Sequence, residues 1–339
     1  MKSISIKRHG GPDVLELINS KEPECKDSLV KVKIKACAIN HLDIWVRRGF
    51  KGIELPLILG SDASGVIIEV GSNVREFKVG DDVVIQPGVF NKSCNMVKRG
   101  LENFSTSYGI LGETQNGVQS EIVVLNEENI FLKPTHLSYE ESSSMQLVFM
   151  TAYQMIVNRA NLIKNESILI YGASSGVGTA AIQIAKDIGA TVITTVGSKN
   201  KIEYALKCGA DHVIMHDKFD IKKQLDKISI FGVDVVFEHI GFKTWKESLK
   251  VLRKGGRIVT CGATTGNMVD IDLNHLFMKQ HSILGSTMGS ISAFHSVMNK
   301  INNKIYKPFI DKIFKFSDVS KAHSRIEKRK QIGKIILIP

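Results

Sequence analysis

The sequence predicts an α/β protein of two domains, one rich in β-strands and one built on a parallel sheet with helices on both faces. The length of 339 residues favours two domains over one. Up to about residue 125, short alternating segments are separated by Gly, Pro and Asn, which is typical of β-strands. From about residue 145, helical patterns alternate with short β-branched runs, as in βαβ units of a parallel sheet.

The first part of the chain and the C-terminal tail both show residue patterns that are typical of β-strands. We expect strands at 28–38, 63–70, 82–87 and 119–125, and tail strands at 313–316 and 334–338 around a helix at 319–328. The tail should therefore rejoin the first domain. The predicted domains are 1–128 together with 310–339, and 129–309.

The second part alternates strands with helices. The expected strands are 167–171, 191–196, 212–215, 233–238, 257–261 and 282–284. The expected helices are 179–188, 199–207 and 245–252, the last of them ended by Gly255-Gly256.

Bulk composition excludes several classes of protein. Hydrophobic residues make up 43% and charged residues 23%, which is ordinary for a globular chain. The longest apolar runs are too short to cross a bilayer, and the start of the sequence lacks the apolar segment of a signal peptide, so we expect a cytoplasmic protein without membrane contact. The net charge of +11 is spread along the chain, which makes nucleic-acid binding unlikely. Five widely spaced cysteines without a C-x-x-C pair do not suggest disulfides or a cysteine-rich zinc site.

A glycine-rich turn follows the strand that ends at Tyr171. It reads Gly172-Ala173-Ser174-Ser175-Gly176-Val177-Gly178 and leads into a helix. Small residues let the backbone approach a phosphate, and the helix N-terminus offers unpaired N–H groups. The turn departs from strict G-x-G-x-x-G, and an ordinary strand-to-helix turn is the alternative. The surrounding βα pattern favours a dinucleotide, with Ser174, Ser175, Gly176 and Val177 at the pyrophosphate.

The end of the next strand bears on the choice of dinucleotide. An acidic residue there would bind the ribose 2′-hydroxyl of NAD. The stretch from Thr194 to Lys201 has no acid, and it has Ser198 and Lys201, which suit a 2′-phosphate. We therefore expect NADPH, with NADH less suited. The same residues would also serve as a plain helix cap and solvated lysines.

Several stretches together resemble the medium-chain dehydrogenase/reductase family over essentially the whole length. The resemblance is closest to the branch of quinone oxidoreductases and zeta-crystallin. The stretches are residues 38–43 (AINHLD), 59–65 (LGSDASG), 69–71 (EVG), 79–83 (VGDDV), 151–153 (TAY), the glycine-rich turn, and 283–288 (ILGSTM). The resemblance implies a GroES-like β-rich catalytic domain, a Rossmann nucleotide-binding domain, and a homodimer formed through the edge strand near residues 282–284.

The zinc ligands of related alcohol dehydrogenases are not kept. Those enzymes place a cysteine ligand where Asn40 stands and a histidine ligand where Ser61 stands, and zinc prefers thiolate and imidazole ligands. Their structural zinc site uses four cysteines, of which residues 91–105 retain Cys94 alone. We expect no metal.

The remaining site residues follow from the resemblance and from side-chain chemistry. Asn40 and Thr151 are predicted to lie near the nicotinamide and the substrate oxygen, with Asp43 orienting them or relaying a proton. Thr151 could instead cap a helix start, and Asp43 could be purely structural. Trp45 and Phe50 would line an apolar pocket or belong to the core. Further cofactor contacts implied by the resemblance are Gly241, Gly262, His216 and Arg329.

These expectations add up to hydride transfer without a metal. Without zinc to polarise a carbonyl, an activated acceptor such as a quinone or an α,β-unsaturated ketone or aldehyde remains feasible. One hydrogen-bond donor at the developing oxyanion is worth roughly 3 kcal/mol. Two alternatives stay open: a zinc-type alcohol dehydrogenase with atypical ligands, and an NADPH-binding structural or RNA-binding protein like zeta-crystallin.

Overall fold

Two units share the chain in this computed structural model, which describes residues 1–49, 52–216 and 218–339. Unit 1 comprises Met1–Leu147 and Ser290–Pro339, and unit 2 comprises Val148–Gly289. These boundaries differ from those predicted at 128/129 and 309/310. The difference at the second boundary arises because the helix α10 (Ile291–Asn302) packs on unit 1. Its Phe294 ring lies edge-on to Phe131, with ring centroids 4.7 Å apart.

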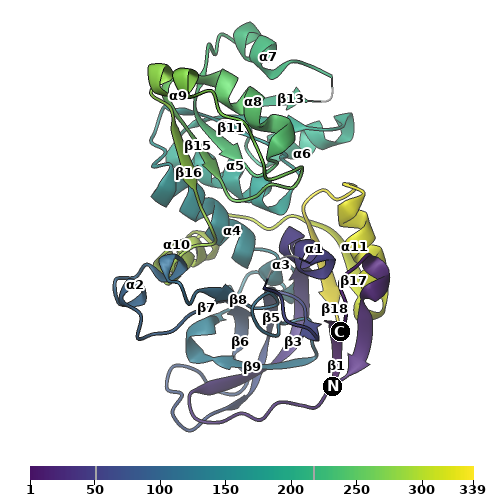
Figure 1. The fold of residues 1–339 in the computed structure, drawn as a ribbon. Coiled ribbons are helices and arrows are strands. Elements are labelled where there is room, and N and C mark those ends of the chain that lie inside the picture. The colour runs from purple at the N-terminus through teal and green to yellow at the C-terminus, as the bar shows by residue number, and fades with distance from the viewer. Residues whose placement is uncertain (50–51, 217) are drawn as a thin grey trace. The chain divides into compact units, whose positions relative to one another are not determined.

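Unit 1 is built on a seven-stranded sheet of order β10-β6-β5-β3-β18-β17, with β9 also paired to β3. The C-terminal strand β18 lies beside β3, antiparallel, so residues from both ends of the chain meet in the middle of this sheet (Figure 1). Inward-facing apolar side chains of alternating strand positions, such as Ile34 and Leu337, form its core.

The elements of unit 1 have the following bounds: β1 Lys2–Ile6, β2 Glu16–Asn19, β3 Leu29–Ile39, α1 His41–Arg48, β4 Leu57–Ile58, β5 Asp62–Val70, β6 Asp82–Ile85, β7 Gly88–Val89, α2 Asn95–Lys98, β8 Gly109–Ile110, β9 Ile122–Asn126, β10 Ile130–Leu132, α3 Tyr139–Ser143, α10 Ile291–Asn302, β17 Ile310–Lys315, α11 Val319–Glu327 and β18 Lys334–Ile338.

Unit 2 is a parallel six-stranded sheet of order β13-β12-β11-β14-β15-β16, which confirms the predicted α/β architecture. All six residues of β14 are buried, as expected for a central parallel strand covered on both faces. The bounds are β11 Ser167–Ile170, α5 Gly176–Ile188, β12 Thr191–Val196, α6 Ile202–Lys207, β13 His212–Met215, α7 Ile221–Lys227, β14 Val233–Glu238, α8 Phe242–Val251, β15 Leu252–Thr260, α9 Leu273–Lys279 and β16 Ser282–Gly285.

Two predicted element boundaries of unit 2 were wrong. Gly255-Gly256 does not follow a helix end, because α8 already stops at Val251 and both glycines lie inside β15. The helix expected from Lys199 begins with a 3-10 turn over Lys199–Lys201, and α6 proper starts at Ile202.

The chain passes from unit 1 to unit 2 within one helix, α4 (Gln146–Tyr153), which continues as a π-helical turn over Gln154–Arg159. Among the described residues, none of the helices has both the length and the apolar character needed to span a bilayer.

Candidate functional site

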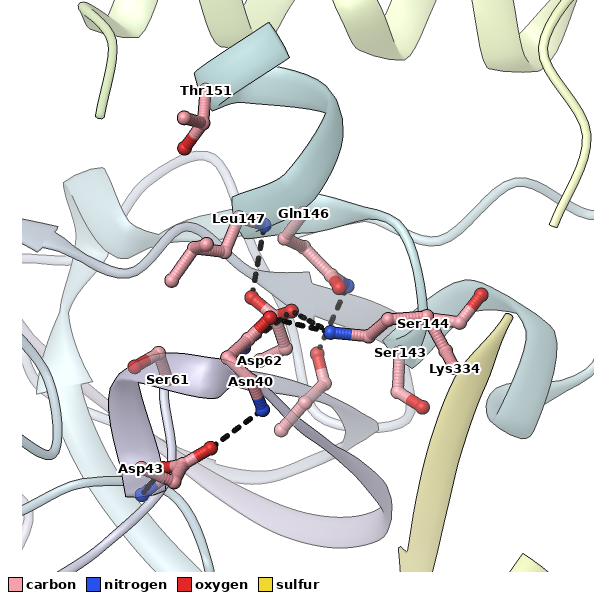
Figure 2. Close-up of polar contacts among 12 residues, drawn as sticks. Asn40, Asp43, Ser61, Asp62, Ser143, Ser144, Gln146, Leu147, Thr151 and Lys334 are labelled. Carbon is pink, nitrogen blue, oxygen red and sulfur yellow. Dashed lines mark hydrogen bonds and ion pairs between the residues drawn. The ribbon is translucent and has the colours of Figure 1, made fainter. Parts of the chain in front are cut away.

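A buried polar network in unit 1 joins Asn40, Asp62 and Lys334 (Figure 2). The Lys334 ammonium donates to Asn40 Oδ1 at 2.5 Å and lies 3.2 Å from Asp62 Oδ2. Asn40 Nδ2 donates to the same Asp62 oxygen at 3.0 Å. Asp62 is 0% exposed and the Lys334 side chain 6%, so the charge pair is held away from water. Each of the three groups therefore fixes the other two.

Strand pairing explains why these distant residues meet. Ile335 of β18 pairs with Ile39 of β3 in an antiparallel register, which brings Lys334 opposite Asn40 at the strand end. Asn40 then caps the N-terminus of α1 with an extended backbone. The other oxygen of Asp62, Oδ1, accepts a hydrogen bond from the backbone N–H of Leu147 at 2.9 Å.

Asp43 lies in the first turn of α1 and is 1% exposed. Its carboxylate accepts the backbone N–H of Asn40 at 2.7 Å and that of Gly60 at 3.0 Å. Burial raises the pKa of Asp43 to about 7, although these two hydrogen bonds and the Lys334 charge act in the opposite direction. Asp43 thus holds the start of α1 against the loop that leads to β5.

The groups at the positions of the zinc ligands do not fit a zinc ion. Asn40 Oδ1 and the Asp62 carboxylate are already bound to the Lys334 ammonium, a charge that repels a cation. The Ser61 hydroxyl donates to the carbonyl of Leu111 at 2.8 Å. Neither thiolate nor imidazole is among these donors.

In residues 91–105, the thiol of Cys94 accepts a hydrogen bond from the Ser105 hydroxyl at 3.2 Å. Across the described part of the chain, no group of three or more His, Cys, Asp or Glu side chains is arranged for a metal.

The glycine-rich turn in unit 2 has the geometry of a phosphate loop. Gly172 adopts φ +66°, a left-handed conformation that favours glycine. A Cβ at Gly178 would lie 2.4 Å from the Gly172 carbonyl oxygen, so only glycine allows α5 to approach β11 this closely. Ser175 is the N-cap of α5, and its hydroxyl accepts the Gly178 N–H at 3.0 Å.

Gly176 and Val177 begin α5, a helix of 13 residues, and Ser174 precedes the cap in the turn. The N–H groups of Gly176 and Val177, at the positive end of the helix dipole, are therefore the ones suited to a pyrophosphate. These residues fit a dinucleotide.

The other predicted contacts of unit 2 lie at the same edge of the sheet. Ser198, His216, Gly241 and Gly262 follow the carboxyl ends of β12, β13, β14 and β15, and the glycine-rich turn follows β11. Ligands of parallel sheets bind at this edge. Lys201 ends the 3-10 turn after β12, and the Ser198 hydroxyl donates to Asn200 Oδ1 at 2.6 Å.

Glu238 is a residue of this edge that the sequence did not single out. Its fully buried carboxylate accepts the backbone N–H groups of Ile240 at 2.6 Å and Gly241 at 3.1 Å. It also accepts the hydroxyls of Thr244 and Ser248, each at 2.8 Å. Gly241 has φ +88°, which favours glycine, and is the N-cap of α8, so Glu238 holds this turn in place.

Four further predicted residues have these positions. The alternative role of Thr151 as a helix-start cap is wrong, because Thr151 lies within α4, where its hydroxyl donates to Met288 Sδ at 3.8 Å. Arg329 is an exposed residue of unit 1 that follows α11 with φ +53°. The Trp45 ring is edge-on to His41, with centroids 5.1 Å apart, and Phe50 lies outside the described residues.

Sequence reasoning missed Asp62 and Lys334. Asp62 adjoins Ser61 in the stretch 59–65, and Ser61 stands where related alcohol dehydrogenases carry a zinc ligand. This neighbourhood was a signal from which Asp62 could have been found. A lysine at the start of the otherwise apolar strand Lys334–Ile338 was a weaker one. The meeting of Lys334 with Asn40 depends on strand register, which the sequence alone does not fix.

Comparisons with known proteins agree with this architecture. Residues 26–135 match the alcohol dehydrogenase GroES-like domain family, and residues 176–303 match the family described as zinc-binding dehydrogenase. The crotonyl-CoA carboxylase/reductase of Cereibacter sphaeroides is 30% identical, over 96% of this chain and 83% of that protein. Quinone oxidoreductase 1 of Escherichia coli is 27% identical, over 99% of each chain.

Solved structures give the same result. A crystal structure titled NAD-dependent alcohol dehydrogenase is 37% identical, with a TM-score of 0.96 and full coverage of both chains. The crotonyl-CoA carboxylase/reductase AntE in complex with NADP is 25% identical, with a TM-score of 0.90, over 100% of this chain and 94% of that one. With the sheet orders, the phosphate loop and these matches in agreement, the chain belongs to the medium-chain dehydrogenase/reductase family of nicotinamide-dependent oxidoreductases.

Proposed function

We propose that this protein transfers a hydride from NADPH to a quinone or an α,β-unsaturated carbonyl compound without a catalytic metal. The observation that carries the proposal is the ammonium of Lys334 bound to Asn40 and Asp62, where related alcohol dehydrogenases hold zinc. A hydrogen bond must then replace the Lewis acid, which limits the acceptor to one that is already electron-poor. The relatives named for quinone and crotonyl-CoA reduction act on acceptors of this type.

The Asn40 amide is the proposed donor to the substrate oxygen. As hydride arrives at the acceptor carbon, negative charge develops on the oxygen, and a prepositioned N–H stabilises that charge more than the neutral ground state. Asp43, with both carboxylate oxygens bound to backbone N–H groups, keeps Asn40 in place. The proton that completes the reduction comes from water or a nearby hydroxyl.

The cofactor would be held by the backbone N–H groups at the start of α5 and by Ser198 and Lys201. When bound, NADPH supplies the hydride. The preference for NADPH rests on the absence of an acidic side chain from Thr194 to Lys201. One structural relative is an NAD-dependent alcohol dehydrogenase, so a preference for NADH is the outcome that would contradict this proposal.

The test measures cofactor oxidation by the purified full chain with NADPH and NADH in parallel. Acceptors are 9,10-phenanthrenequinone, trans-2-hexenal and acetaldehyde, with ethanol and NADP⁺ or NAD⁺ for the reverse direction. We expect turnover of the quinone or the enal, higher kcat/KM with NADPH, and no loss of rate in EDTA. Ethanol oxidation together with one bound zinc per chain would instead identify a zinc alcohol dehydrogenase. NADPH binding without turnover of any acceptor would support the structural role.

We also propose that β16 pairs with β16 of a second copy. It is an edge of the six-stranded sheet and pairs with β15 alone among the described residues. The preceding helix α9 exposes Leu273, Phe277 and Met278, each more than 60% exposed. Apolar side chains beside an open strand edge suit a homodimer. Size-exclusion chromatography with light scattering should give a molar mass of twice 37.5 kDa. Phe277→Asp should lower this mass toward that of the monomer.

A further inference from the structure

We propose that Lys334 is a positioning residue that fixes the polarity of the Asn40 amide, so that Asn40 presents an N–H and not a carbonyl oxygen to the substrate. This inference rests on the proposed role of Asn40 as the donor to the substrate oxygen. It assigns a function to a residue that lies 294 positions away from Asn40 in the sequence.

The two partners of the Asn40 amide leave one orientation. Lys334 carries only donors and the Asp62 carboxylate carries only acceptors. Oδ1 therefore faces Lys334 at 2.5 Å, and Nδ2 faces Asp62 at 3.0 Å. Turning the amide by half a rotation would set its N–H groups against the ammonium and its oxygen against the carboxylate. Both contacts would become repulsive in a site where little water screens the charges.

This orientation leaves one donor for the substrate. An amide NH₂ has two N–H groups, and among the described residues the Nδ2 of Asn40 has Asp62 as its single acceptor. Oδ1 is taken by the ammonium. The second N–H is the group that can bind a developing oxyanion. Without Lys334, Asp62 alone would favour this orientation, and the Asn40 amide would present its oxygen part of the time.

The network also explains why the cation itself is not the proposed donor. Lys334 directs its ammonium at two protein groups, Asn40 Oδ1 and Asp62 Oδ2, so its charge is compensated inside unit 1. Its effect on the reaction then passes through the amide. That distinction can be measured with a double-mutant cycle, because residues that act through one another are non-additive.

The kinetic experiment compares Asn40→Ala, Lys334→Met and the double variant in the full chain, with NADPH and either 9,10-phenanthrenequinone or trans-2-hexenal. We expect Asn40→Ala to lower kcat on the order of 100-fold, as for loss of one oxyanion donor, and Lys334→Met to lower kcat by a smaller factor, because the amide still presents an N–H for part of the time. KM for NADPH should change less than about twofold. The double variant should be no slower than Asn40→Ala alone, and Lys334→Arg should recover most of the rate because guanidinium is also a pure donor.

A matched control is the other buried lysine of the same sheet. Lys31 lies in β3, its side chain is 11% exposed, and its ammonium lies near Glu22 and Glu69. It is eight strand residues from Ile39, about 26 Å away at the usual rise. Lys31→Met should leave kcat unchanged. Should Lys334→Met fail to fold, Lys334→Gln with Asp62→Asn removes both charges together and is expected to lose kcat to the same extent.

A second readout does not depend on turnover. In protein labelled with ¹⁵N-asparagine, the side-chain peaks lost in Asn40→Asp identify the Asn40 amide. We expect Lys334→Met to move or broaden these peaks and Lys31→Met to leave them unchanged. Unchanged peaks in Lys334→Met would show that Lys334 does not orient the amide.

The kinetic outcomes separate the inference from the proposed function. If Asn40→Ala leaves kcat unchanged, the donor role of Asn40 fails, and the inference that Lys334 presents an N–H to the substrate fails with it. If Asn40→Ala lowers kcat but the double variant has a still lower kcat than Asn40→Ala alone, Asn40 keeps its role and the inference about Lys334 fails. If Lys334→Met raises KM for NADPH at constant kcat, Lys334 contacts the cofactor. That result would also overturn the inference.

Discussion

The network of Asn40, Asp62 and Lys334 in unit 1 and the glycine-rich turn of unit 2 achieve a defined geometry by opposite means. The network uses charged and amide side chains that come from the turn between β3 and α1, from β5 and from β18, and they are buried together. The turn uses seven consecutive residues, most of them Gly, Ala or Ser, and the groups proposed to bind a phosphate there are backbone N–H groups.

The difference teaches where each region is vulnerable. Removing one member of a buried charge pair leaves an uncompensated charge, which costs more than the pair itself contributes. A backbone site has no side chain to remove, so it is sensitive only to added volume or to altered φ and ψ.

Asp62→Asn should lower the free energy of unfolding of unit 1 by roughly 3–5 kcal/mol, because Lys334 would stay buried without its carboxylate. Denaturant unfolding followed by Trp45 fluorescence, in a Trp245→Phe background, reports on unit 1 alone. Glu16→Gln is the control in the same unit, since its pair with Lys7 is more than a third exposed and should contribute less than about 1 kcal/mol. Equal losses in the two variants would contradict the buried character of the network.

Asp43→Asn should change how stability depends on pH. The pKa of Asp43 rises from its ordinary 3.8 to about 7 on folding, so between these values the folded state binds more protons than the unfolded state. Its contribution is present at low pH and is lost as pH rises through about 7, on the order of 4 kcal/mol over the full window. The same unfolding assay at pH 5 and pH 8 should show a smaller pH dependence in Asp43→Asn. Parallel curves for the two proteins would count against the raised pKa.

Gly178→Ala should weaken NADPH binding at least tenfold and cost unit 2 about 1–3 kcal/mol, because the new Cβ meets the Gly172 carbonyl oxygen at 2.4 Å. Fluorescence titration with NADPH measures the binding. Gly285→Ala is the control in the same unit, since a Cβ there meets no atom within 4 Å beyond its own residue and its two chain neighbours. If both variants bind NADPH like the wild type, the turn does not hold the pyrophosphate.

Lys201→Ala should lower kcat/KM for NADPH about tenfold, which corresponds to roughly 1.4 kcal/mol, and leave that for NADH almost unchanged. Lys207→Ala removes a similar charge from the end of α6, where Lys207 pairs with Glu203 at 2.7 Å, and serves as the control. Steady-state kinetics with both cofactors give the ratio. A loss shared equally between NADPH and NADH would remove Lys201 from the 2′-phosphate.

The contrast between a local turn and a network of distant residues also explains which parts of the site could be predicted from the sequence. The strand-turn-helix pattern around Gly172–Gly178 is local, so its position and its glycine requirement could be predicted from consecutive residues. Asn40 and Ser61 were found through resemblance to a family. The contact between Asn40 and Lys334 could not be predicted, because it depends on the pairing of β18 with β3 across most of the chain.

Two differences between the sequence-based expectations and the structure have a similar origin. A helix start was the alternative for Thr151, but α4 already begins at Gln146, and no glycine or proline between them marks a boundary. The domain boundary predicted at 309/310 lies beyond α10, whose attachment to unit 1 involves tertiary contacts such as the Ile291 N–H with Glu102 Oε2 at 3.2 Å. Local patterns locate elements, and packing decides to which unit they belong.

The place of β18 in the sheet also has a consequence for biosynthesis. During translation β3 and Asn40 leave the ribosome almost 300 residues before Lys334 does. In that interval Asp62 and Asn40 have no cation, and β3 has an open edge where β18 will pair. The nascent N-terminal part must therefore wait, incompletely folded, while the nucleotide-binding unit is already fully synthesised. Folding of this protein should run from the middle of the chain outward, with the network of Asn40, Asp62 and Lys334 assembled last.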